Sequence, residues 1–178
     1  MRVFVTCVGH CGSVSFREAC RHTSNYSTGH ETQCGLLEYP DNHIEVNPQM
    51  RICIVEIAEK YPDSKWVHLK RNPETCIPSL AALGHGSVMQ AYRNLNPTIM
   101  PNANPEDIAE RFYVSENNAI TSQLSYAVPP DNQTIIHIEE VQSRWKWFWD
   151  WIGAEGNFES SLESWNIKRN TGEERGEK

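Results

Sequence analysis

The 178-residue chain lacks the features that mark several classes of protein. No run of residues is long and apolar enough to span a bilayer, so we expect no membrane association. The first residues enter a strand-like segment without the basic start and apolar core of a signal peptide, which indicates a cytoplasmic protein. The net charge of −7 lacks the basic excess typical of nucleic-acid-binding surfaces, so we expect no nucleic-acid partner.

The sequence also lacks the cysteine pattern of a disulfide framework or a structural zinc site. Its six cysteines are better explained as reduced thiols in a chain of this length and kind. A zinc site would need Cys7 and Cys11 together with nearby histidines. However, Cys7 falls in the first expected strand, and no second ligand pair has finger-like spacing. We therefore expect no metal.

The chain shows neither internal repeats nor a linker, which predicts one domain over residues 1–168 and a charged tail over residues 169–178 that we expect to be disordered. Strands are expected at residues 3–6, 66–69 and 134–138, with His68 and His137 as core histidines. Residues 22–46 are too polar and irregular for one long element. Helices are expected at residues 15–21, 48–60, 104–126, 142–152 and 158–165, and from Pro73 onward. This alternation predicts an α/β fold with a mostly parallel central sheet flanked by helices.

The most informative segment is RVFVTCVGHCGSVSFR, which begins at Arg2. A β-branched strand runs into a turn of small residues, and a helix then begins near Ser15. Unpaired N–H groups at a helix start, together with the helix dipole, favour an anion there, and glycines let it approach the backbone. The segment predicts a site for a phosphorylated or sulfated ligand made by Gly9, His10, Cys11, Gly12, Ser13, Val14 and Ser15.

A second segment, KWVHLKRNPETCIPSL, is consistent with the same kind of ligand. Arg71 ends an expected strand and Ser79 lies two turns into the helix that follows. Because ligands of open α/β sheets bind beyond the carboxyl ends of the strands, both side chains could meet one phosphate there. The planar, permanently charged guanidinium of arginine suits phosphate oxygens.

Together the two segments resemble the donor-binding elements of sulfotransferases that use 3′-phosphoadenosine 5′-phosphosulfate (PAPS). In that family a G-x-G-R-C-G-S/T loop holds the 5′-phosphosulfate, and the arginine of a later R-D-P motif and a helix serine hold the 3′-phosphate. Here the loop is V-G-H-C-G-S-V-S and the later motif is R-N-P-E-T-C-I-P-S, with the family's order and spacing. The likeness extends to His30-Glu31, to IIHIEE and to WFWDWIGAEGNFESSLESW, and is strongest to small bacterial and viral members with a G-H-E segment.

The resemblance implies a P-loop-like domain that moves a sulfuryl group from PAPS to a hydroxyl of a carbohydrate or small metabolite. It implies that residues 9–15, Arg71 and Ser79 bind the donor. His10 stands where the family commonly has arginine, and it would donate to the bridging or sulfuryl oxygens. Glu31, with neighbouring His30, is the candidate base near the acceptor hydroxyl, and Glu45 is the fallback. The acceptor and the oligomeric state stay open.

Two alternatives remain at this point. His10-Cys11 with Arg17 fits H-C-x5-R, the phosphate loop of cysteine phosphatases, in which a thiolate attacks phosphorus. Against it, Val14 replaces the usual mid-loop glycine and Glu18 follows Arg17 where a hydroxyl is expected. The other alternative is a non-catalytic nucleotide-binding module of the same fold, which the histidine in the loop would permit.

Overall fold

The computed structural model describes residues 1–32, 37–83, 88–100, 102–167 and 169. Residues 170–178, which make up nearly all of the charged tail, lie outside this described part. Within it, five strands form one sheet: β1 (Arg2–Thr6), β2 (Ser27–His30), β3 (His43–Val46), β4 (Lys65–Lys70) and β5 (Gln133–His137). The helices are α1 (Ser13–Cys20), α2 (Ile54–Lys60), α3 (Pro73–Ala81), α4 (Val88–Leu95), α5 (Pro105–Ala127), α6 (Val141–Trp151) and α7 (Phe158–Trp165), with 3-10 turns η1 (Pro48–Ile52), η2 (Pro130–Asn132) and η3 (Ile138–Glu140).

The sheet has the strand order β2-β3-β1-β4-β5, and every pairing is parallel. This confirms the predicted α/β fold with a parallel central sheet. After β1 the chain builds β3 on one side of it and β4 on the other, so the direction of winding reverses at β1. In open α/β sheets the crevice beyond such a reversal is where ligands bind.

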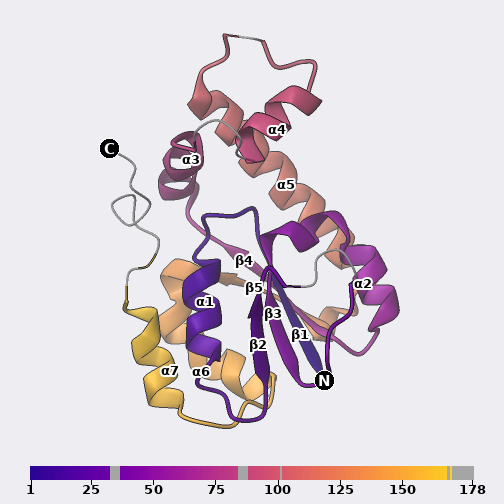
Figure 1. Cartoon of the computed structure of the whole chain (residues 1–178), viewed down its shortest axis with the longest axis vertical. Helices are drawn as coiled ribbons and strands as arrows, with labels where there is room; N and C mark the ends of the chain where they lie inside the picture. Colours follow the sequence, from indigo (N-terminus) through magenta and orange to yellow (C-terminus); the bar gives the residue numbers. More distant parts are fainter. Residues whose placement is uncertain (33–36, 84–87, 101, 168, 170–178) are drawn as a thin grey trace.

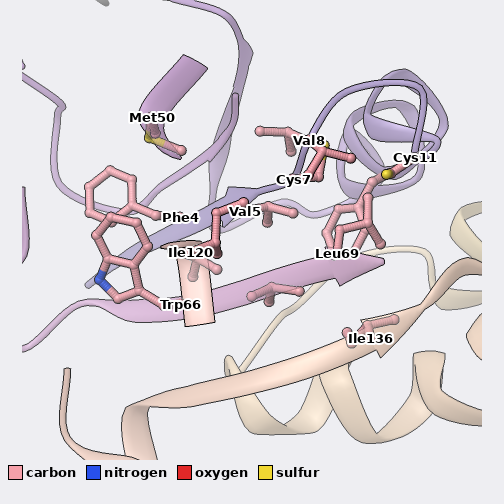
Figure 2. Packing of buried hydrophobic residues seen from close by; sticks show 14 of the residues in the cluster. Phe4, Val5, Cys7, Val8, Cys11, Met50, Trp66, Leu69, Ile120 and Ile136 are labelled. Atoms are coloured by element: carbon pink, nitrogen blue, oxygen red, sulfur yellow. The ribbon is translucent and has the colours of Figure 1, made fainter. Parts of the chain in front are cut away.

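Helices cover both faces of the sheet. Figure 1 shows α1, α6 and α7 grouped on one side and α2 and α5 on the other. On the first side, Phe16 of α1 packs edge-on against Trp145 and Phe148 of α6 and Trp165 of α7. On the second side, the rings of Phe4 and Trp66 from neighbouring strands have centroids 4.8 Å apart. Figure 2 shows the two side chains next to each other. The core therefore lies on both faces, and the strands are buried between the helix layers.

Several expected elements are confirmed, with small shifts at their ends. The strands near residues 3, 66 and 134 and the helices near residues 15, 73, 104, 142 and 158 are all present. His68 is a buried core histidine as predicted, and its Nε2 donates to Asn117 Oδ1 of α5 at 2.9 Å. The prediction for His137 was wrong: it ends an edge strand and its side chain is exposed.

Other parts of the chain differ from the expectation. The helix expected over residues 48–60 is divided, because Cys53, between the end of η1 at Ile52 and the start of α2, has a φ of −140° that is not helical. The polar stretch before it contains β2 and β3, which alternation of apolar residues did not reveal. β2 is an edge strand with one buried residue, and β3 buries the polar His43 and Glu45 beside its apolar residues. Helix α4 was not predicted either.

Candidate functional site

A cavity of about 1060 Å³ lies beyond the carboxyl ends of the strands. Residues that follow each of the five strands line it: Val8, Gly9, His10, Gly12, Ser13, Val14 and Ser15 after β1, His30 and Glu31 at the end of β2, Pro48, Gln49, Arg51 and Ile52 after β3, Arg71, Ser79, Leu83 and Val88 after β4, and Ile138 after β5. Trp165, Asn166, Ile167 and Arg169 complete the lining. The volume is at the upper end of the range for small-molecule sites, so the cavity has room for more than one compact ligand.

Three residues of the loop after β1 have left-handed backbone conformations. Gly9, His10 and Gly12 all adopt positive φ angles, of 89°, 55° and 79°. Gly12 immediately precedes α1, so the unpaired N–H groups of the first helical turn begin at Ser13. A side chain at Gly12 would be strained at this φ angle, and its Cβ would lie 3.5 Å from Ile138 of η3. The local sequence therefore folds as predicted, with α1 starting two residues earlier than expected.

The structure brings Arg71 and Ser79 to this loop, as their spacing predicted. Ser79 Oγ lies 2.8 Å from His10 Nδ1, and Arg71 Nη1 donates to the carbonyl of His10 at 3.0 Å. Arg71 follows β4 directly, and Ser79 faces the loop because Asn72 and Pro73 start α3 immediately after that strand. Arg71 and Ser79 therefore both contact His10, although they lie 61 and 69 positions further along the chain.

His30, the last residue of β2, and Glu31, which follows it, line the same cavity. His30 Nε2 is 3.1 Å from Ser13 Oγ at the start of α1. Desolvation by burial lowers the pKa of His30, so its ring is mainly neutral at neutral pH. Glu31 is exposed and has a φ of 55°, a conformation that is costly for a residue other than glycine. A hydrogen bond from its N–H to the Val46 carbonyl, 3.3 Å, joins the turn to β3.

Glu45, the fallback base, does not line the cavity. Its side chain is fully buried, and its carboxylate accepts hydrogen bonds from Thr32 and His43. A base must reach the acceptor hydroxyl, so the fallback prediction was wrong about this residue's place in the site. The reason is that β3 lies inside the sheet, between β1 and β2, so that its side chains are enclosed.

Cys11 is the one residue of the predicted loop whose side chain turns away from the cavity. It is 1% exposed, and its Sγ lies 3.2 Å from the Gly9 carbonyl and 3.9 Å from Cys76 Sγ. Figure 2 shows it in the core, with Cys7 on the same loop. Hydrogen bonding to the thiols of Cys7 and Cys76, together with burial, raises the pKa of the Cys11 thiol.

This environment contradicts the cysteine-phosphatase alternative. Such an enzyme needs an accessible thiolate with a lowered pKa, and Cys11 has neither property. The arginine that should clamp the phosphate is also engaged elsewhere, because Arg17 Nη1 forms an ion pair with Glu18 at 2.5 Å. None of the five cysteines in the described residues forms a disulfide.

Two further cationic residues line the cavity, Arg51 and Arg169. No motif predicted either one. Arg51 Nε donates to Glu116 Oε2 of α5 at 2.8 Å, and Arg169 Nη1 donates to the Ser164 carbonyl at the end of α7 at 2.6 Å. The sequence position of Arg51 could have indicated its place in the cavity. It lies five residues after the carboxyl end of β3, and residues that follow the strands line the cavity. The described lining residues include three arginines and one carboxylate, that of Glu31. Glu116, outside the lining, compensates the charge of Arg51, so the positive charge of the lining comes chiefly from Arg71 and Arg169.

The described residues contain no cluster of three or more His, Cys, Asp or Glu side chains that could hold a metal ion. None of the helices in the described part of the chain has both the length and the apolar character that crossing a bilayer requires.

No protein-family model matches the chain, and no curated protein sequence matches it. Solved structures do match. A sulfotransferase domain from the curacin biosynthetic pathway has a TM-score of 0.67 and 16% identity, over 90% of this chain and 75% of that chain. Mouse sulfotransferase SULT7A1 complexed with PAP has a TM-score of 0.59 and 12% identity, over 93% of this chain and 63% of that chain. The chain thus has the P-loop-like α/β fold of sulfotransferases and spans less than two thirds of the mouse protein.

Proposed function

We propose that this protein is a PAPS-dependent sulfotransferase that transfers the sulfuryl group to a hydroxyl of a carbohydrate or small metabolite. The observation that carries the proposal is the meeting of Arg71 and Ser79 with His10 on the loop after β1. By the resemblance, the loop would bind the 5′-phosphosulfate of PAPS, and Arg71 and Ser79 would bind its 3′-phosphate. They meet beside a helix N-terminus, on the fold of sulfotransferases.

The charge and size of the cavity support a polyanionic donor. Arg51, Arg71 and Arg169 line it, so a nucleotide with several negative charges is favoured there although the chain as a whole is acidic. The N–H groups at the start of α1, with Ser13 and Ser15, would receive the 5′-phosphosulfate. Arg71 and Ser79 would receive the 3′-phosphate. The remaining volume, beside Glu31 and η1, would receive the acceptor.

The transfer step follows from this placement. The acceptor oxygen forms a bond to sulfur while the bond from sulfur to the bridging phosphate oxygen breaks, and the bridging oxygen keeps the electron pair. By analogy with phosphoryl transfer, negative charge grows on that leaving oxygen, where His10 and the loop N–H groups stabilise it. Glu31 takes the proton of the acceptor hydroxyl. The products are a sulfate ester and 3′,5′-adenosine bisphosphate (PAP).

The first test is calorimetric titration with PAP beside ADP, which lacks the 3′-phosphate. We expect micromolar binding of PAP and much weaker binding of ADP. Arg71→Ala should weaken PAP binding about 100-fold or more, the usual cost of removing one partner of a desolvated charge pair. Arg111→Ala, an exposed arginine on α5, is the matched control and should bind as the wild type does. Absence of PAP binding to the wild type would refute the proposed donor.

A further inference from the structure

Glu45 is a buried carboxylate that the proposed mechanism does not use. Its Oε1 accepts from the backbone N–H of Thr32 at 2.8 Å. Its Oε2 accepts from the Thr32 hydroxyl at 2.5 Å and from His43 Nε2 at 3.1 Å. A buried carboxylate is costly unless hydrogen bonds compensate for its lost hydration, and here three donors do so. Two of the three come from a single residue, Thr32.

Thr32 is the residue that follows Glu31. Two hydrogen bonds therefore hold the backbone around Glu31, which we call the Glu31 turn. The N–H of Glu31 donates to the Val46 carbonyl, and the N–H of Thr32 donates to Glu45. A non-glycine residue at a φ of 55° needs such support, because the conformation is unfavourable by itself. Both supports come from β3, which lies beside β2 in the sheet.

Gly29 provides the space for this arrangement. A Cβ atom built on Gly29 would lie 2.2 Å from Glu45 Oε2, 2.6 Å from Thr32 Oγ1 and 3.0 Å from His43 Nε2. Any side chain there would displace the carboxylate from its donors. The φ angle of Gly29 is not in the left-handed region, so space and not backbone conformation requires the glycine.

We propose that Glu45 is a positioning residue that, through Thr32, holds Glu31 at the cavity, and that Gly29 is required to make room for it. This inference rests on the proposed function, in which Glu31 accepts the proton of the acceptor hydroxyl. Glu45 itself touches neither donor nor acceptor. It preorganises the base by preventing the turn from relaxing to an ordinary conformation.

The first experiment measures the turn itself, by amide hydrogen exchange of Thr32 in the nuclear magnetic resonance spectrum. In Glu45→Gln the exchange rate should rise about tenfold or more, because the glutamine amide has no charge and only one acceptor oxygen for donors that now bind two. PAP affinity by calorimetry should stay at the wild-type value. Glu59→Gln, an exposed glutamate on α2, is the matched control and should change neither quantity. Unchanged Thr32 exchange in Glu45→Gln would overturn the proposal.

The second experiment asks whether Glu45 acts through Glu31. The rate of sulfate release from sulfur-labelled PAPS, with water as acceptor, is compared for Glu45→Gln, Glu31→Gln and the double variant. We expect a lower kcat with an unchanged KM for PAPS, and no further loss from Glu45→Gln once Glu31 is replaced. Additive losses would show a general structural role instead and would reject the proposal.

Milder variants guard against failure to fold. Thr32→Val removes the hydroxyl donor and should lower kcat, whereas Thr32→Ser keeps the donor and should restore it. Gly29→Ala should reproduce Glu45→Gln in both experiments. If the wild type fails to bind PAP, the proposed function falls, while the Thr32 exchange rates still decide whether Glu45 holds the turn.

Discussion

His10 is the residue of the loop after β1 that contacts both Arg71 and Ser79. Its backbone is left-handed, its carbonyl is bound by Arg71, and its ring lies 2.8 Å from Ser79 Oγ. The family that the loop resembles commonly has arginine at this position, and arginine keeps its charge while histidine does not. The side chain of residue 10 therefore bears directly on whether the loop supports transfer or only binds nucleotide.

Replacing His10 separates these two possibilities. We expect His10→Ala to lower the rate of PAP formation from PAPS about 100-fold, the usual effect of removing one donor to a developing oxyanion. His10→Arg should keep most of the activity, because it supplies a permanent donor at the same place. A wild type that binds PAP and is inactive, together with an active His10→Arg, would instead identify a nucleotide-binding module.

Helix α3 places Ser79 in the lining of the cavity. Asn72 Oδ1 accepts from Glu74 N at 2.9 Å, and Pro73 occupies the first helical position, so the helix begins directly after Arg71. Because the helix begins at Pro73, Ser79 lies on the side of α3 that faces the loop after β1. Helix α5 begins with the same Asn-Pro-Glu pattern, where Asn104 Oδ1 accepts from Glu106 N at 3.1 Å, but it places no residue in the cavity.

The two caps therefore make a matched pair of variants. Asn72→Ala and Asn104→Ala should each lower the free energy of unfolding by about 1 kcal/mol, the typical contribution of such a cap, as measured by urea denaturation. Only Asn72→Ala should also weaken PAP binding, because α3 carries Ser79, which we propose binds the donor, whereas α5 contributes no residue to the cavity. Equal PAP affinities in the two variants would mean that the start of α3 does not matter for Ser79.

At this scale the helices were easier to predict than the strands. Asn-Pro caps act within a few residues, so the starts at residues 48, 73 and 105 could be located from sequence. β3 was not predicted, because the polar residues His43 and Glu45 interrupt its apolar pattern, although both are buried in the structure. Their burial depends on partners in the neighbouring strand and turn, which periodicity along one segment does not reveal.

For the molecule as a whole, His68 links the sheet to the longest helix. This residue of β4 is buried and donates to Asn117 of α5, and burial lowers its pKa to about 3. Below its ordinary pKa of about 6.5 the unfolded chain binds a proton that the folded chain does not. Stability should therefore fall with falling pH between about 6.5 and 3, by at most about 1.4 kcal/mol per pH unit from this residue.

Urea denaturation across this pH range measures the effect. Carboxylates contribute to the same trend, so the informative quantity is the difference between the wild type and His68→Gln. We expect His68→Gln to show a shallower fall of the free energy of unfolding as the pH drops from 6.5. Parallel curves would indicate that His68 takes up its proton in the folded protein at an ordinary pKa.

Local sequence was enough to predict the α/β class, the small-residue turn after β1, and the approach of Arg71 and Ser79 to the carboxyl edge of the sheet. These depend on backbone preferences, capping and periodicity within short segments. Only the tertiary structure decided that Cys11 faces the core, that Glu45 supports the turn of Glu31, and that Arg51 and Arg169 join the cavity. Those outcomes depend on which strands are neighbours and which way each side chain faces, and contacts between distant residues determine both.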